Sequence, residues 1–167
     1  MNLSDLIRER YSVRAYKDER VPTDVLNDVL EAARLAPTAA NRQPFRIILM
    51  DIDPNRMRLG SVYQAPWFFQ APLAICMCAV PDEAWTNRDG QNYAWVDATI
   101  AMDHLILAAA DAGLGTCWIA AFDVDAAREA FEIPPEWQPV ALTPLGYPND
   151  SPRQKKRKSL DELVVRR

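Results

Sequence analysis

The sequence predicts one domain that combines helices with a sheet of about four strands. Its 167 residues fall within the usual size of a single domain and can bury a sizeable core, so the domain is predicted to span residues 1–167. Hydrophobic residues make up 49% and charged residues 25%, as in globular proteins, which excludes a wholly disordered chain. Segments with helical periodicity alternate with short apolar runs, which is the pattern of a mixed fold.

Several segments have the pattern of helices. Residues 3–10 predict a short amphipathic helix, and a second helix begins near Thr23 and ends before Pro37, because proline disfavours the helical conformation of the preceding residue. Residues 54–70 are predicted to be helical in pieces. The longest helix is predicted over 91–112.

The helix predicted over 91–112 is apolar nearly all round. Its polar residues Asp97, His104 and Asp111 repeat every seven positions and therefore lie along one narrow stripe. Such a helix must be buried on most sides, so a partner subunit is a reasonable source of the cover.

Four short apolar runs have the composition of buried strands. They span residues 45–51, 72–80, 116–122 and 137–147. Branched residues predominate in the first two, which are bounded by proline, aspartate or charge. In the last run, Pro139 and Pro144 suit an edge strand or a bulge.

Charge and cysteine content exclude several classes of protein. A net charge of −4 argues against a nucleic-acid binder, since phosphate backbones require a basic field. The most apolar segment is interrupted by Asp97, Asp103 and Asp111, so no membrane span is predicted, and the charged N-terminal residues show no signal peptide. Three cysteines are too few and odd in number for a disulfide framework, which indicates a reducing compartment and predicts a cytoplasmic protein.

Signals for a dinucleotide domain, a metal or a catalytic side chain are weak. Gly113 and Gly115 lack the third glycine of a Rossmann fingerprint, and they follow a helix instead of a strand. Cys76 and Cys78 in an apolar strand indicate core packing, so no metal site is predicted. His104 has no accompanying nucleophile motif, and no side chain is predicted to be catalytic.

Two basic segments near the chain ends are candidates for an anion site. If RYSVRAY is extended, Arg10, Ser12 and Arg14 point to one face, and guanidinium groups bind phosphate with paired hydrogen bonds. In SPRQKKRKS, alternation likewise pairs Lys155 with Arg157. Each segment alone is explained as an exposed charged turn or a solvated tail, and their combination favours the anion site.

The stretch APTAANRQPF, residues 36–45, is built differently from a plain connector. It gathers small and amide residues between two prolines that restrict the backbone. We interpret it as a loop that presents a fixed surface.

Taken together, four motifs resemble the nitroreductase family of flavin enzymes. They are RYSVRAY, APTAANRQPF, AAADAGLGTCWIAAF and PLGYP followed by RQKKRK, and their order and spacing match over nearly the whole chain. The resemblance implies an α+β fold with a central, mostly antiparallel sheet of about four to five strands wrapped by helices. It also implies an intimate homodimer with two sites for flavin mononucleotide (FMN) at its interface.

The resemblance implies a set of cofactor-binding residues. Arg10, Lys155 and Arg157 would hold the flavin phosphate with Ser12 nearby, and Arg14 would face the pyrimidine edge of the ring. The loop residues Pro37, Thr38, Ala39 and Asn41 would reach across the dimer and pack on the flavin. The segment Ile119, Ala120 and Ala121 would pass the ring, where a backbone N–H meets the hydride-accepting nitrogen, and Gln64 is a candidate for the pyrimidine. Trp67, Phe68 and Trp85 would line the substrate pocket or fill the core.

The function implied is that of an FMN-dependent oxidoreductase, in which the flavin carries the chemistry. It would take hydride from NAD(P)H and reduce a small acceptor, such as a nitroaromatic or a quinone, by a ping-pong mechanism. The alternative is a non-catalytic FMN-binding protein for storage or sensing.

Overall fold

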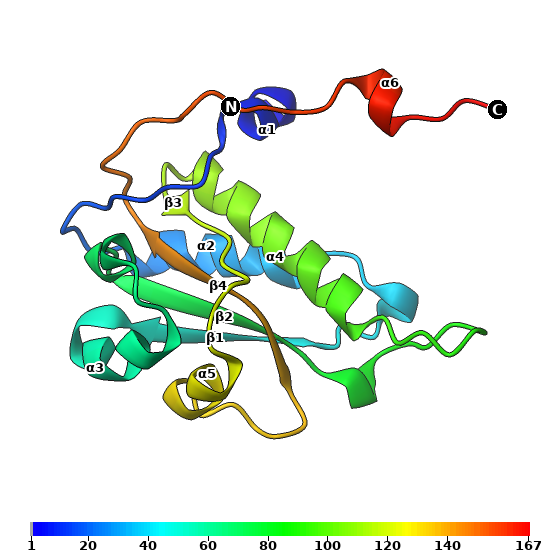
Figure 1. The fold of residues 1–167 in the computed structure, drawn as a ribbon, viewed down its shortest axis with the longest axis horizontal. Helices are drawn as coiled ribbons and strands as arrows, with labels where there is room; N and C mark the ends of the chain where they lie inside the picture. The colour runs from blue at the N-terminus through cyan, green and yellow to red at the C-terminus, as the bar shows by residue number, and fades with distance from the viewer. Residues whose placement is uncertain (1) are drawn as a thin grey trace.

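The computed structural model describes residues 2–167 and confirms the α+β fold, a four-stranded antiparallel sheet with helices on both faces (Figure 1). The strands are β1 (Phe45–Asp51), β2 (Leu73–Ala79), β3 (Gly115–Thr116) and β4 (Gln138–Gly146). Their order in the sheet is β1-β2-β4-β3, and each neighbouring pair runs antiparallel.

The predicted helices are present, with ends that differ by a few residues. The helices are α1 (Leu3–Glu9), α2 (Thr23–Arg34), α3 (Ile52–Val62) and α4 (Ala94–Asp111), together with two that the sequence did not predict, α5 (Val124–Ala130) and α6 (Leu160–Leu163). Short 3₁₀ helices cover Ala39–Asn41, Pro66–Gln70 and Pro81–Glu83. The region 54–70 is helical in pieces, as predicted, because it contains most of α3 and then a separate 3₁₀ turn.

The strand predicted over 116–122 is wrong in length. Only Gly115–Thr116 forms a ladder with β4. The next backbone N–H, of Cys117, donates to the side-chain oxygen of Thr143 (3.0 Å) instead of to a backbone carbonyl. Pairing resumes at one position, where Ile119 and Leu142 exchange hydrogen bonds of 2.8 and 2.9 Å. Cys117 and Ile119 are buried, whereas Trp118, Ala120 and Ala121 are exposed, so the segment does not extend the ladder.

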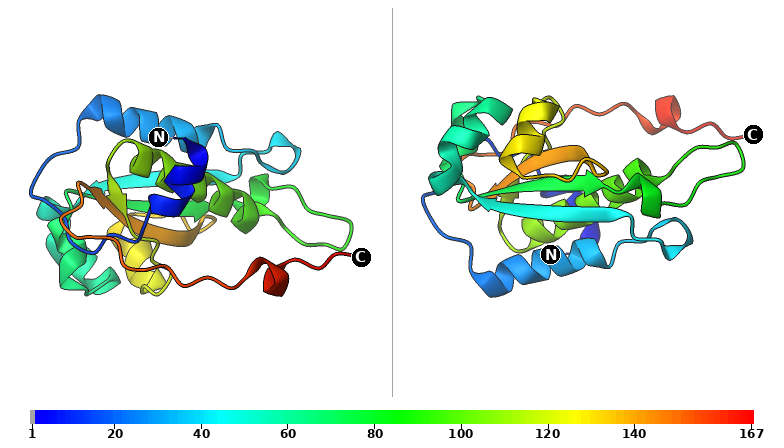
Figure 2. Two further views of the ribbon diagram at one scale, coloured as in Figure 1. Left: turned by 90° about the horizontal axis from the view of Figure 1, so that it is seen from above. Right: turned by 90° about the horizontal axis from the view of Figure 1, so that it is seen from below.

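Both faces of the sheet are covered, which explains the continuous apolar run of β2. Cys76 and Cys78 point into the cluster that α3 and α5 form with the sheet, and Ile75 and Met77 point toward α2 and α4. Figure 2 shows these two helix pairs on opposite sides of the sheet. The cysteines therefore fill the core, as their sequence context indicates.

Helix α4 packs against α2 and the sheet but leaves apolar residues uncovered. Its N-terminal turn exposes 49% of Trp95 and 40% of Val96. The polar stripe is split, because Asp97 is buried whereas His104 is exposed and pairs its Nδ1 with the carbonyl of Ile100 (3.1 Å). Within residues 2–167, none of the helices combines the length and hydropathy that a bilayer crossing needs.

The C-terminal residues 151–167 form an extended arm that includes α6. In Figures 1 and 2 the arm runs past α1 and beyond the body of the molecule. It carries four exposed apolar residues, Leu160, Leu163, Val164 and Val165.

Candidate functional site

The two basic segments meet at one hollow of about 280 Å³. We call it the basic cradle, and five predicted residues line it: Arg10, Ser12, Arg14, Lys155 and Arg157. Residues 10–16 reach it as an extended segment that is tied to the sheet, since Val13 N–H donates to Thr116 O (2.9 Å). Residues 147–157 follow directly from β4, and Tyr16 bridges to Pro148. The fold thus brings together residues almost 150 positions apart in the chain.

Tyr11 and Asp150 clamp the two segments of the cradle together. The Tyr11 hydroxyl donates to Asp150 Oδ1 (3.0 Å), and the Arg14 backbone N–H donates to Asp150 Oδ2 (2.8 Å). Burial and the contact with Asp150 raise the pKa of Tyr11 to about 12, so its hydroxyl remains a donor at neutral pH. The clamp uses both oxygens of Asp150, and the cationic side chains are left facing the hollow.

Lys155 lies in a locally positive field. Its Nζ donates to the backbone carbonyl oxygens of Ile7 and Arg8. Desolvation lowers the pKa of Lys155, and repulsion by Arg10 and Arg157 lowers it further. A bound anion would offset that repulsion, so the residues present fit an anionic group such as a phosphate.

Arg14 is oriented by an aromatic side chain. Its Cζ lies 5.9 Å from the centre of the Trp67 ring, within the range of a cation–π contact. Trp67 in turn meets Tyr63 edge to face, with ring centres 5.7 Å apart. Gln64 is exposed and belongs to the same turn, three residues before Trp67. Phe68 is fully buried and belongs to the core.

The thiol nearest the cradle is Cys117, which lies beside Ser12. Burial raises the pKa of Cys117, and the positive charge of Arg14 only partly opposes this effect. The thiol is therefore harder to ionise than an ordinary cysteine, which makes it a weaker nucleophile.

Residues 119–121 run along the edge of the sheet next to β4. The Ile119 N–H donates to Leu142 O (2.8 Å) and is not available to a ligand. Ala120 and Ala121 are exposed, and their N–H groups have no protein acceptor within residues 2–167. Two backbone donors are thus available where the resemblance implies one.

The loop formed by residues 38–43 has an unusual backbone. Ala40, Asn41 and Gln43 have φ values of 51°, 54° and 54°, in the left-handed region that favours glycine. A left-handed residue other than glycine costs about 1–3 kcal/mol, and strain of this kind is often found at functional sites. Thr38 helps to hold the turn, because its Oγ1 accepts from Gln43 N–H (3.0 Å).

The loop and the basic cradle lie at opposite ends of the sheet. Phe45, which follows the loop, pairs with Ala79 at one end of β2, whereas Leu73 at the other end of β2 pairs with Leu145, next to β3 and the cradle. Figures 1 and 2 show the same separation. Six residue steps of strand span roughly 20 Å. One chain therefore does not bring Thr38, Ala39 and Asn41 to its own cradle.

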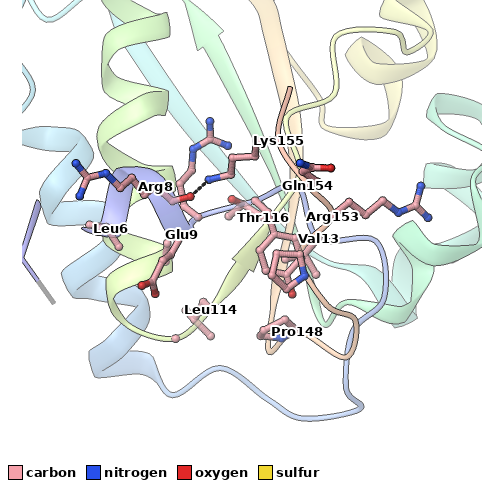
Figure 3. A pocket seen from close by; sticks show the side chains of 15 residues that line it. Leu6, Arg8, Glu9, Val13, Leu114, Thr116, Pro148, Arg153, Gln154 and Lys155 are labelled. Carbon is pink, nitrogen blue, oxygen red and sulfur yellow. Dashed lines mark hydrogen bonds between the residues drawn. The ribbon is translucent and has the colours of Figure 1, made fainter. Parts of the chain in front are cut away.

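A larger hollow of about 650 Å³ adjoins the basic cradle. It lies between α1, the turn that follows α4 and residues 148–155, and Arg10 and Lys155 border both hollows. Figure 3 shows its apolar lining from Leu6, Leu114 and Pro148. The neighbouring Ile7 of α1 is half exposed.

Sequence reasoning missed two features of the cradle. Alternation along an extended RYSVRAY would put Tyr11 on the face opposite Arg10, whereas Tyr11 lines the hollow and binds Asp150. Asp150 could have been suspected from the sequence because it directly precedes the basic segment. Its contact with Tyr11 arises because the chain that leaves β4 runs beside residues 10–16. Trp67 was considered for the substrate pocket, and its contact with Arg14 was not foreseen.

Comparison with known proteins identifies the family to which this chain belongs. The model of the nitroreductase family matches residues 7–59 and 51–147, which is most of the chain. A protein of Methanothermobacter thermautotrophicus, provisionally named NADH dehydrogenase/NAD(P)H nitroreductase, is 31% identical over 161 residues, covering 91% of this chain and 80% of that protein. The chain belongs to the nitroreductase family and is an oxidoreductase.

Solved structures agree with this assignment. A nitroreductase family protein from Clostridium difficile superposes with a TM-score of 0.90 at 35% identity, covering 99% of this chain and 98% of that chain. An FMN-dependent nitroreductase from the same species gives a TM-score of 0.80 at 27% identity and covers 98% of both chains. The resemblance inferred from the four motifs is confirmed.

Proposed function

We propose that this protein is an FMN-dependent oxidoreductase that works as a homodimer and uses NAD(P)H to reduce a small acceptor such as a nitroaromatic or a quinone. The observation that carries the proposal is the basic cradle, in which Arg10, Ser12, Arg14, Lys155 and Arg157 line a single hollow. Relatives support the choice of cofactor and reductant through their names, which specify FMN dependence and NAD(P)H nitroreductase activity.

The cradle fits the phosphate of FMN. Arg10, Lys155 and Arg157 supply charge-assisted hydrogen bonds, and Ser12 adds a hydroxyl donor. Each such bond contributes about 1.5–3 kcal/mol, so two or three of them favour a phosphorylated ligand strongly over an uncharged one. Desolvation and, after it, repulsion by Arg10 and Arg157 lower the pKa of Lys155, and a bound anion would offset the repulsion.

Neighbouring groups suit the ring of the flavin. Arg14, oriented by Trp67, offers positive charge to the pyrimidine edge, and Gln64 offers an amide close by. The exposed N–H groups of Ala120 and Ala121 are donors for the ring nitrogens. When bound, FMN supplies the redox chemistry, accepting hydride from NAD(P)H and passing it to the acceptor. The protein contributes position and electrostatics.

A second copy of the chain is required for the loop to take part. Pro37, Thr38, Ala39 and Asn41 lie at the end of the sheet remote from the cradle of the same chain. In a homodimer the loop of one protomer would meet the cradle of its partner. The exposed apolar residues of the C-terminal arm and of α4 are surfaces that such a dimer would cover.

Visible spectroscopy of the purified protein tests the proposal. We expect a yellow protein with about one FMN per protomer and a mass in solution of twice the 18.9 kDa chain. NAD(P)H should bleach the flavin, and a nitroaromatic or a quinone should restore it, with parallel double-reciprocal lines in steady state. A colourless monomer that takes up no FMN would contradict the proposal. Bound FMN without turnover would favour the storage or sensing alternative.

A further inference from the structure

We propose that Asp97 is a positioning residue that holds the cofactor-binding loop, residues 38–43, in its left-handed conformation. The inference rests on the proposed function, because it takes the flavin as the ligand of the loop. Asp97 lies on the first turn of α4 and reaches the loop across 58 positions of sequence, where its Oδ1 accepts from the backbone N–H of Ala39 (3.0 Å).

Asp97 lies in surroundings where a carboxylate is unexpected. Only 1% of the residue is exposed, and the helix around it contributes Ala94, Ala98 and Ala101 to an apolar cluster. Its second oxygen, Oδ2, is also buried and has no hydrogen-bond partner within residues 2–167. An incompletely paired buried carboxylate is unfavourable, so a residue of this kind requires an explanation.

Helix stability does not explain why Asp97 is buried. An acidic residue in the first turn interacts favourably with the helix dipole. An exposed aspartate at a neighbouring position would provide the same benefit without desolvation. What distinguishes Asp97 is its contact with Ala39, which an exposed side chain could not make.

The contact with Asp97 is the link from the loop to α4. The other hydrogen bonds of residues 38–43 join residues within 38–45: Gln43 N–H to Thr38 Oγ1, Asn41 N–H to Thr38 O, Arg42 N–H to Ala39 O, Gln43 Nε2 to Asn41, and Phe45 N–H to Gln43 O. These bonds shape the turn without attaching it to the helix. Ala40 and Asn41 follow Ala39 directly and have left-handed backbones that require support. Fixing the N–H of Ala39 therefore fixes where Thr38 and Asn41 are presented to a ligand.

Flavin affinity in two variants that remove the same hydrogen bond tests the proposal. Asp97→Ala removes the acceptor, and Ala39→Pro removes the donor. Proline is compatible with position 39, because Thr38 before it is extended and position 39 begins a 3₁₀ turn. In titrations with FMN and with riboflavin, each variant should bind both ligands with about ten-fold lower affinity than wild type, as expected for the loss of about one hydrogen bond. The double variant should be no weaker than either single variant.

Matched variants separate positioning from folding. Asp97→Asn keeps an oxygen for the Ala39 N–H and should bind both flavins within about three-fold of wild type. Asp103→Ala removes an exposed carboxylate from the same helix and should leave both affinities unchanged. An altered cradle should reduce the affinity for FMN but not for riboflavin, whereas an altered loop should reduce both equally.

Several outcomes would overturn the inference. The positioning role would be excluded if Asp97→Ala bound flavin as tightly as wild type, or if Asp97→Asn and Asp97→Ala lost the same flavin affinity. In either case FMN binding by the wild type would still support the proposed function. Additive losses in the double variant would show that the two residues act separately. If Asp97→Ala does not fold, Ala39→Pro gives the same test with Asp97 intact, and unchanged flavin affinity in that variant would also overturn the inference. A wild-type protein that takes up neither flavin would defeat the proposed function and this inference together.

Discussion

The charge of Lys155 in the cradle depends on its surroundings. Desolvation, Arg10 and Arg157 all lower its pKa below the ordinary 10.5. A lysine is charged below its pKa, so Lys155 loses its positive charge at a lower pH than an ordinary lysine. The phosphate of FMN, with a second pKa of about 6, is fully charged above neutrality and does not change in this range.

FMN affinity should therefore fall at alkaline pH, beginning below the pH at which an ordinary lysine titrates. Tyr11, with its pKa raised to about 12, remains neutral through this window. Fluorescence titrations of FMN across the range check the effect. Lys155→Arg should remove the decline, since guanidinium stays charged. If FMN affinity fell by the same amount in Lys155→Arg, the pH dependence would have to come from a group other than Lys155.

The cradle should act on phosphate and leave the rest of the flavin unaffected. In the double variant Lys155→Ala with Arg157→Ala, two charge-assisted contacts are lost, each contributing about 1.5–3 kcal/mol. FMN binding should weaken roughly 100-fold or more, whereas riboflavin, which lacks the phosphate, should bind as to wild type. Equal losses for both ligands would instead indicate damage to the C-terminal segment.

At the scale of elements, the cradle depends on the close approach of β3 to residues 10–16. A Cβ added at Gly115 would lie 2.7 Å from Val13 Cγ2 and 2.9 Å from Val13 Cβ. Val13 is buried between Ser12 and Arg14, so it cannot move without displacing the cradle. Glycine is needed here because of the contact, not because of its backbone angles.

Gly115→Ala should destabilise the protein by roughly 1–3 kcal/mol, the usual cost of overpacking, and should also weaken FMN binding. Thermal unfolding and FMN titration measure the two effects. Gly60 in α3 is the matched control, because an added Cβ there meets nothing within 4 Å and alanine favours the helix by up to about 1 kcal/mol. Unchanged stability in Gly115→Ala would show that the sheet tolerates the added volume.

Strands and helices with a clear pattern could be predicted from the sequence, and contacts made by single side chains could not. Composition located β1 over 45–51, and periodicity located α2 and α4. The run 116–122 has the same composition but stops pairing, because Thr143 takes the N–H of Cys117. Asp97 was grouped with His104 by its seven-residue spacing, although packing against the loop buries one and leaves the other exposed.

At the scale of the whole molecule, the two predicted halves of the flavin site lie at opposite ends of one sheet. Motif recognition identified the cradle and the loop, and the expectation that the loop crosses a dimer came from the family resemblance. The strand register now gives a physical reason for that expectation, since β1 and β2 separate the halves by roughly 20 Å within one chain. In the homodimer we propose, each loop would lie at the other protomer's cradle.

Complementation between two defective chains tests this arrangement most directly. One chain carries Lys155→Ala with Arg157→Ala in the cradle, and the other carries Thr38→Ala with Asn41→Ala in the loop; each alone should bind little FMN. The two chains are co-expressed with different affinity tags, and the mixed dimer is purified through both tags. It should hold one FMN per dimer, half the wild-type content, because one of its two sites combines an intact cradle with an intact loop. If each site were built within one chain, both sites would be defective, and a mixed dimer with as little FMN as its parents would contradict the shared site.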